Sequence, residues 1–221
     1  MSEPEHPDTR TRILDAAEEI ARRRGLDALS MRAIAERIGL SAPAAYRHFR
    51  SKSEIVRAMI ERGRDRFVRG LAAALRGSKG PEEILAVSAR YYLRFWLRDR
   101  AGFRLAAEWG RQEPSLTGAA VAGGSFGDVP ALVAAILGGT RDPGETARIG
   151  RWVASTLYGM ALSLVQDEEI PQAREQELIE SAADYLVGAV RTAASGRSSG
   201  GKPPAGHMES ARRNGRGRSD V

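Results

Sequence analysis

The segment from Leu29 to Lys52, LSMRAIAERIGLSAPAAYRHFRSK, restricts the fold of this chain most strongly. Ser30 precedes a helical pattern, and its hydroxyl can accept a hydrogen bond from a first-turn N–H. Gly39 predicts the end of that helix, because glycine enters the left-handed backbone region without a steric penalty. Ser41 then predicts a second N-cap, with Pro43 in the first turn, where a missing N–H costs nothing. We therefore expect two short helices joined by a tight turn.

The residues on these two helices favour contact with DNA. Three apolar residues share one face of the first helix, which is expected over residues 31–38: Ile34, Ala35 and Ile38. The second helix has small residues at its start and hydrogen-bonding side chains one turn later: Tyr46, Arg47 and His48. This layout is typical of a helix-turn-helix whose second helix enters the major groove by its N-terminal end. Double-stranded DNA is therefore the expected partner.

Helical periodicity continues along the rest of the chain, and no segment alternates with a period of two. The further helices are expected over 9–24, 53–76, 81–98, 101–109, 130–137, 142–166 and 171–194. Ser51 and Glu54 form a capping box before the long fourth helix, and the Gly-rich segment 113–128 is expected to be loop. The fold class is therefore all-α. Residues 1–52 are expected to form a three-helix helix-turn-helix domain, 53–195 a second helical domain, and 196–221 a disordered basic tail.

Charge and composition support this division. The net charge of +6 is uneven, because the tail after Ser195 has six basic residues against two acidic ones. Residues 10–52 contain ten basic residues against five acidic ones, which suits contacts with phosphates. The charges of Arg22, Arg23 and Arg24 favour a helix C-terminus, with phosphate contact as the alternative. The first residues lack a secretory apolar core, and no apolar run approaches a membrane span, so a cytoplasmic location is expected without a membrane partner.

The residues needed for catalysis are scarce. The chain has no cysteine, which excludes disulfides, thiolate nucleophiles and cysteine-based zinc sites. His48 belongs to the expected recognition helix, and the other two histidines lie near the ends of the chain. No His-Glu-x-x-His metal motif or Gly-x-Ser-x-Gly elbow occurs, and the glycines of AGGSFGD lack the Gly-Lys-Ser/Thr ending of a phosphate loop. We expect neither an enzyme nor a cofactor or metal site.

The segment GLDALSMRAIAERIGLSAPAAYRHFRSKSEIVRAMIE resembles the DNA-binding region of the TetR (tetracycline-repressor-like) transcriptional regulators. The shared features are Ala-Ile-Ala in the first helix of the pair, Gly-Leu-Ser at the turn, Tyr-Arg-His-Phe, and Ser-Lys-x-Glu before a long helix. The resemblance covers about the first quarter of the chain. It implies a homodimer whose last two helices form a four-helix bundle with those of the partner, and we expect a repressor. It also implies a small-molecule effector bound in the C-terminal domain, whose binding releases the operator.

The same resemblance assigns roles to single residues of the helix-turn-helix. Base-facing positions are expected at Ala42, Pro43, Ala44 and Arg47, behind the cap residue Ser41. Phosphate-contacting positions are expected at Tyr46, His48 and Lys52, and Ser30 and Arg32 flank the groove from the preceding helix. The Ala-Pro-Ala start can offer only apolar contacts, whereas Arg47 can donate two hydrogen bonds to a guanine. We therefore expect specificity to depend on Arg47 and on DNA shape.

Aromatic residues in the C-terminal part are candidates for a ligand cavity, although aromatic stripes at helical spacing are more often plain core. The candidates are Tyr91, Phe95, Trp96, Phe103, Trp109, Phe126, Trp152 and Tyr158. The stripe of apolar and small residues from Trp152 to Leu164 is expected to form the dimer interface. Two alternatives to a ligand-controlled repressor stay open. One is a DNA-binding regulator controlled by a protein partner, and the other is a helical small-molecule-binding protein or enzyme.

Overall fold

The computed structural model describes residues 8–112, 129–137 and 142–195, and within these ranges the chain forms helices and no strand. The prediction of an all-α fold is therefore confirmed for the described residues. The elements are α1 (Thr9–Arg24), the 3-10 turn η1 (Leu26–Ala28), α2 (Met31–Ile38), α3 (Ala42–Tyr46), α4 (Lys52–Ala74), α5 (Pro81–Arg98), α6 (Arg100–Gln112), α8 (Val129–Ile136), α9 (Pro143–Gln166) and α10 (Gln172–Ser195). The predicted loop over 113–128 and the predicted disordered tail lie outside the described residues.

Apolar side chains gather in two cores. The N-terminal core lies between α1, α2, α3, the first half of α4 and Trp109 of α6, and contains the fully buried Ile13, Ile34, Phe49 and Ile55. The C-terminal core lies between the second half of α4, α5, α6, α8, α9 and α10, with Phe67 among its buried members. Each large side chain removed from water in this way stabilises the fold by about 1.5–3 kcal/mol. Much of the stripe expected at the dimer interface instead fills the C-terminal core, where Val153, Leu157 and Ala161 are fully buried.

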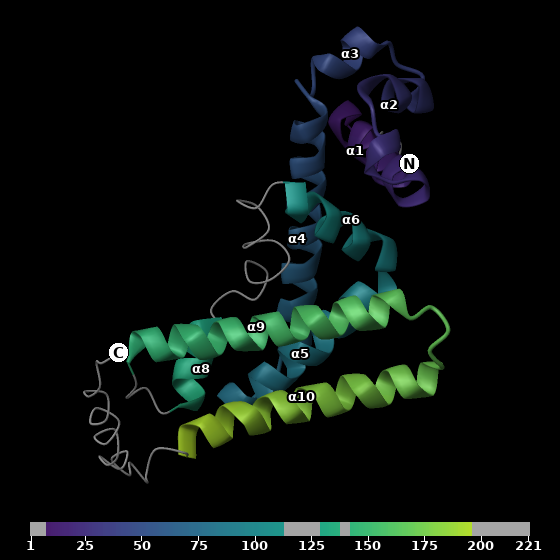
Figure 1. The fold of residues 1–221 in the computed structure, drawn as a ribbon. Helices are drawn as coiled ribbons and strands as arrows, with labels where there is room; N and C mark the ends of the chain where they lie inside the picture. The colour runs from purple at the N-terminus through teal and green to yellow at the C-terminus, as the bar shows by residue number, and fades with distance from the viewer. Residues whose placement is uncertain (1–7, 113–128, 138–141, 196–221) are drawn as a thin grey trace, which may run out of the picture.

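The long helix α4 joins the two cores. Val56, near its start, is buried in the N-terminal core, whereas Phe67 is buried in the C-terminal core. Its 23 residues correspond to a length of about 35 Å. Figure 1 shows α1, α2 and α3 gathered at one end of α4, and α9 and α10 lying side by side across its other end. The division of the chain at residues 52–53 stays a prediction, because α4 contributes to both cores.

Phe67 is the aromatic centre of the C-terminal core. Its ring lies 5.2 Å from that of Tyr91, 6.1 Å from that of Tyr92 and 5.1 Å from that of Phe95, each in an edge-to-face arrangement. Such pairs add about 0.5–1.5 kcal/mol beyond the area they bury. Because all three partners belong to α5, these contacts hold α5 against α4.

Gly70 permits a close approach between α4 and α5. A Cβ atom at this position would overlap with the hydroxyl of Tyr91 and would lie 2.8 Å from its Cζ atom. Since Gly70 has an ordinary helical backbone, the requirement for glycine here comes from this approach and not from the backbone conformation.

Helix ends follow the sequence closely where a capping residue is present. Ser51 accepts a hydrogen bond from the Glu54 N–H at 3.2 Å, as the capping box predicts. The Glu54 carboxylate, however, accepts from the Arg50 N–H at 2.7 Å and not from that of Ser51.

The helix predicted over 101–109 instead runs from Arg100 to Gln112. Gly110 therefore does not end it, because a glycine inside a helix costs only about 1 kcal/mol.

Candidate functional site

The helix-turn-helix has the caps that its sequence predicts. Ser30 accepts a hydrogen bond from the Ala33 N–H at 3.1 Å, and Ser41 accepts one from the Ala44 N–H at 3.3 Å. Gly39 has a φ of 71°, the left-handed conformation expected at the end of α2. The turn is therefore determined locally, by two capping hydroxyls and one glycine.

Two arginines of α1 attach this unit to the rest of the domain. Arg10 donates to the His48 carbonyl at 3.1 Å, and its guanidinium lies 4.1 Å from the centre of the Phe49 ring. Arg12 donates to the Ile38 carbonyl at 2.9 Å. Both carbonyls lie at or just after the C-terminal ends of short helices, where backbone acceptors lack helical partners. Sequence reasoning missed both contacts, because the partners are 26 and 38 residues apart and share no pattern.

The predicted DNA-contacting residues run from Ser30, the N-cap of α2, through α3 to Lys52, the first residue of α4, at the end of the molecule away from α9 and α10 (Figure 1). α3 ends at Tyr46, so Arg47 and His48 follow this helix instead of lying on it as predicted. The exposed members are Ser30, Arg32, Ser41, Pro43, Tyr46 and Arg47, and the half-buried ones are Ala42, Ala44, His48 and Lys52. The Lys52 ammonium donates to the Leu26 carbonyl at 2.5 Å. Lys52 therefore holds η1 against the start of α4, which the sequence did not indicate.

Ion pairs neutralise much of the basic charge of the N-terminal domain. Arg32 pairs with Glu36 at 2.8 Å, and Arg37 pairs with Glu19 at 2.6 Å. Hydrogen bonds from Arg37 lower the pKa of the Glu19 carboxyl, which keeps the link between α1 and α2 charged at neutral pH. Arg47, by contrast, has no ion pair or hydrogen-bonding partner for its side chain among the described residues. The guanidinium predicted to read a base is thus exposed and available.

Three of the predicted ligand-binding aromatics line one cavity, with a volume of about 80 Å³: Phe95, Trp96 and Trp109. Phe103 is fully buried in the C-terminal core, with its ring 5.3 Å from Trp96 and 5.6 Å from Tyr158. Tyr91 packs on Phe67 and Gly70. Phe103, Tyr158 and Tyr91 do not line the cavity.

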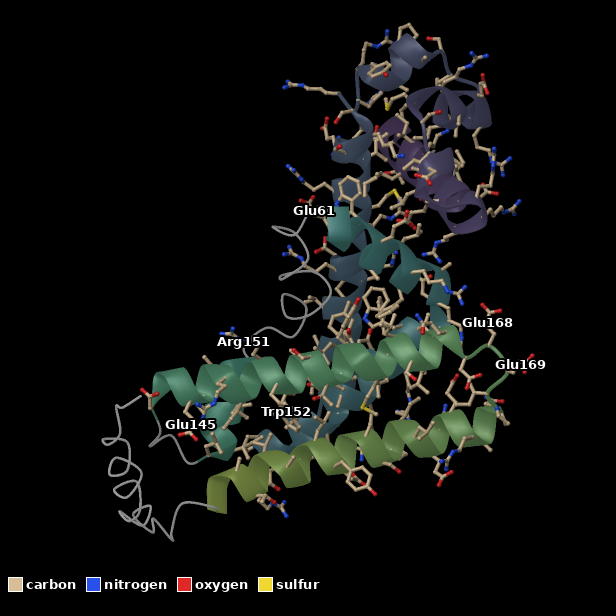
Figure 2. The ribbon with its side chains drawn as sticks, in the orientation of Figure 1. Glu61, Glu145, Arg151, Trp152, Glu168 and Glu169 are labelled. Atoms are coloured by element: carbon tan, nitrogen blue, oxygen red, sulfur yellow. The ribbon has the colours of Figure 1, made fainter. Side chains whose placement is uncertain are left out.

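Trp152 and Phe126 differ from the other aromatic candidates. Trp152 is 46% exposed on α9, where Figure 2 labels it, and it lies outside the cavity. A sequence stripe cannot distinguish it from the neighbouring Val153, which is fully buried in the C-terminal core. Phe126 lies outside the described residues.

The cavity lies at the junction of the two cores, between α1, α4, α5 and α6. At its rim, Arg22 forms a bidentate ion pair with Asp99, with N–O distances of 2.6 and 2.7 Å. Asp99 also accepts a hydrogen bond from the Gly102 N–H at 2.9 Å, as the N-cap of α6. A Cβ atom at Gly102 would lie 2.6 Å from the Asp99 Cγ, so only glycine admits the carboxylate in this position. The sequence interpretation of Arg22 as a helix-end charge missed this partner, which is 77 residues away.

The exposed sides of α9 and α10 carry aromatic and small residues that no other described part of the chain covers. Along α9 they follow helical spacing: Trp152, Ser155, Gly159 and Ser163. On α10, Tyr185 is 78% exposed and Gly188 is exposed one turn later. Large aromatic groups beside small residues make a surface on which another helix pair can pack closely.

Comparison with known proteins defines the family. The model of the bacterial regulatory proteins of the tetR family matches residues 13–59. An HTH-type transcriptional regulator of Mycobacterium tuberculosis, Rv1255c, is 32% identical over 194 residues, which are 87% of this chain and 90% of that protein. The chain belongs to the TetR family.

This TetR-family chain is also similar to a further regulator in sequence and to a solved structure in fold. The HTH-type transcriptional activator FasR of Mycolicibacterium smegmatis is 36% identical over 99 residues, 45% of each chain. The structure of FadR from Bacillus subtilis, in complex with stearoyl-CoA, has a TM-score of 0.67 at 16% identity and covers 80% of this chain and 97% of its own. That likeness shows a shared fold. The chain is thus a DNA-binding transcriptional regulator, as its helix-turn-helix predicts.

The described part of this TetR-family chain shows no sign of a membrane span or of a metal site. None of its helices is long and apolar enough to cross a membrane. No group of three or more metal-ligating side chains is found there.

Proposed function

We propose that this protein is a dimeric repressor that reads its operator through α3 and releases it when a small, largely hydrophobic ligand binds. The single observation that carries the reading of DNA is the exposed Arg47 side chain, unpaired among the described residues, beside the apolar start of α3. A guanidinium can donate two hydrogen bonds to the O6 and N7 atoms of guanine. The methyl and methylene groups of Ala42, Pro43 and Ala44 offer contacts to thymine methyls. We assign Tyr46 and His48 to contacts with phosphates.

The test is to replace Arg47 by alanine and to measure the loss of sequence discrimination. Bound sequences are first selected from a random DNA library with the unaltered protein. Affinities are then measured for the selected site and for sites with single base changes. A lost bidentate contact should cost about 1–3 kcal/mol at one base pair, and the preference there should disappear.

The matched control is Arg69→Ala, which removes the same charge from an exposed position in the second half of α4. It should leave the base preference unchanged. If Arg47→Ala keeps the full preference for the selected site, Arg47 does not read a base.

Two features support a small-molecule effector. The junction cavity is lined by aromatic side chains, and a regulator of the same fold, FadR, has been solved in complex with stearoyl-CoA. FasR is named an activator, so activation is the second candidate for the effect on transcription. Transcription from the selected operator, with and without the regulator, distinguishes repression from activation. Control by a protein partner instead of a ligand would leave the purified protein on DNA with every small molecule tested.

The exposed faces of α9 and α10 support a dimer. A two-fold reader needs recognition helices about 34–36 Å apart, and pairing through these helices places one reading unit on each side of the axis. Light scattering at working concentration should give the mass of two chains, and the mass of one chain would contradict the proposal. We place the protein in the cytoplasm, where its DNA is, and assign it no enzymatic activity or cofactor.

A further inference from the structure

We propose that the cavity between α1, α4, α5 and α6 is the effector site itself, shared by both domains. We infer that it takes a single-ring aromatic molecule carrying a hydrogen-bond acceptor such as a carbonyl. This inference rests on the proposed control by a small molecule and specifies where that molecule binds. It makes the ligand a direct contact of the DNA-binding domain, and not only of the C-terminal core.

The lining of the cavity comes from both domains. The N-terminal core contributes Leu26, Val56, Met59 and Ile60, together with Leu105 and Trp109 of α6, and the C-terminal core contributes Phe67, Phe95 and Trp96. Four of these side chains are aromatic, which favours a flat aromatic body. Among the charged lining residues, Arg22 pairs with Asp99, Arg66 pairs with Glu18, and Arg64 is exposed, so the apolar walls favour a ligand without a strong charge.

A buried donor supplies the polar part of the specificity. Trp109 is 7% exposed, and its indole N–H has no acceptor among the described residues. An indole nitrogen can only donate, so an acceptor on the ligand would satisfy it. The Trp96 N–H also has no acceptor in hydrogen-bond geometry, but the Tyr92 hydroxyl interacts with it, so the argument depends on Trp109.

The size of the cavity links binding to movement of the domains. A cavity of about 150 Å³ is known to hold benzene in another protein, whereas this one has about 80 Å³. We infer that an aromatic ring would widen this cavity. The Arg22–Asp99 ion pair joins α1 to the start of α6 at its rim and would oppose that widening. A ligand bound here would favour a different position of the reading unit, which is the energetic requirement for an effector.

The test uses the indole N–H signals of the full-length protein in ¹H–¹⁵N spectra. Three tryptophans give three signals, which are assigned by replacing each tryptophan with phenylalanine. The probe is acetophenone. It should shift the Trp109 signal downfield in a saturable way and leave that of the exposed Trp152 in place. α-Methylstyrene, which has a methylene group in place of the carbonyl oxygen, should bind at least about tenfold more weakly, because it leaves the donor unpaired.

Substitutions at Gly63 provide the matched controls. Gly63 lines the cavity, and a Cβ atom there meets only the Arg66 guanidinium, at 3.9 Å. Gly63→Leu should fill the cavity and abolish the acetophenone-induced shift, whereas Gly63→Ala should retain it. Asp99→Asn, which removes the ion pair, should bind acetophenone more tightly than the unaltered protein.

Each outcome decides a separate claim. The site assignment is overturned if Trp109 and Trp152 respond alike, or if Gly63→Leu binds the probe as well as Gly63→Ala does. Equal or weaker binding by Asp99→Asn overturns the role of the ion pair. Acetophenone that binds without weakening operator affinity leaves a cavity with no regulatory effect and refutes the effector assignment. Operator binding measured without acetophenone tests the proposed function independently of all of these.

Discussion

Asp99 makes two different contacts at the domain junction, and two substitutions separate them. The carboxylate pairs with Arg22 and also caps α6 through the Gly102 N–H. Asparagine preserves a capping oxygen but removes the charge, whereas alanine removes both. The stability lost in Asp99→Asn therefore measures the ion pair alone. The stability lost in Asp99→Ala measures the ion pair and the cap together.

The expected magnitudes follow from the exposure of the two side chains. Arg22 is 37% exposed and Asp99 is 22% exposed, so water screens the pair, and we assign it about 1 kcal/mol despite its bidentate geometry. The helix cap adds about 1 kcal/mol. Asp99→Asn should thus lower the free energy of unfolding by about 1 kcal/mol, and Asp99→Ala by about 2 kcal/mol.

Urea denaturation at one fixed protein concentration is the assay, since the stability of a dimer depends on concentration. The double variant Arg22→Gln with Asp99→Asn should lose less than the sum of the two single variants, because both changes remove the shared ion pair, whereas the longer contact of Arg22 with Glu18 is lost only with Arg22. Raising the salt concentration should reduce the effect of Asp99→Asn but not the cap contribution. Additive losses in the double variant would refute the ion pair, and equal stability of Asp99→Asn and Asp99→Ala would refute the cap.

Two further predictions concern the C-terminal core. Gly70→Ala should destabilise the protein by about 1–3 kcal/mol in urea denaturation, because the new methyl group overlaps with the Tyr91 ring; unchanged stability would contradict this close approach. Burial raises the pKa of the Tyr92 phenol, so its contribution to stability is complete below about pH 10 and is lost at higher pH. Above pH 10, the free energy of unfolding of Tyr92→Phe should therefore fall less steeply with pH than that of the unaltered protein. Identical pH profiles of the two proteins would refute burial of Tyr92 as the cause.

The local features of the fold could be predicted from the sequence because their causes lie within a few residues. The predicted span of α2 agrees with the structure, since Ser30 and Gly39 determine its two ends. α5 agrees as well, because Pro81 begins it in the first helical turn and its apolar residues keep one spacing. The end of α6 was placed too early, because no capping residue stands there and periodicity alone does not mark a boundary.

The candidate site could be predicted only in part, because periodicity identifies a face but not what covers it. Trp152 and Val153 are adjacent on an apolar stripe, yet one is 46% exposed and the other is buried. Phe103 and Trp109 both read as core or cavity residues, and only Trp109 lines the cavity. The packing of α6 against α1 and α4 makes this difference, and it depends on contacts between distant segments.

The sequence by itself determined the helices, the helix ends that carry a capping residue and the helix-turn-helix, because hydrogen bonds between near neighbours control these features. Only the tertiary structure decided which charges remain available and where the cavity lies. Arg22 and Arg37 find carboxylates that are distant in sequence, whereas Arg47 finds none among the described residues. Composition counts these arginines alike, but an ion pair requires two side chains within about 4 Å, and only the packed chain brings them that close.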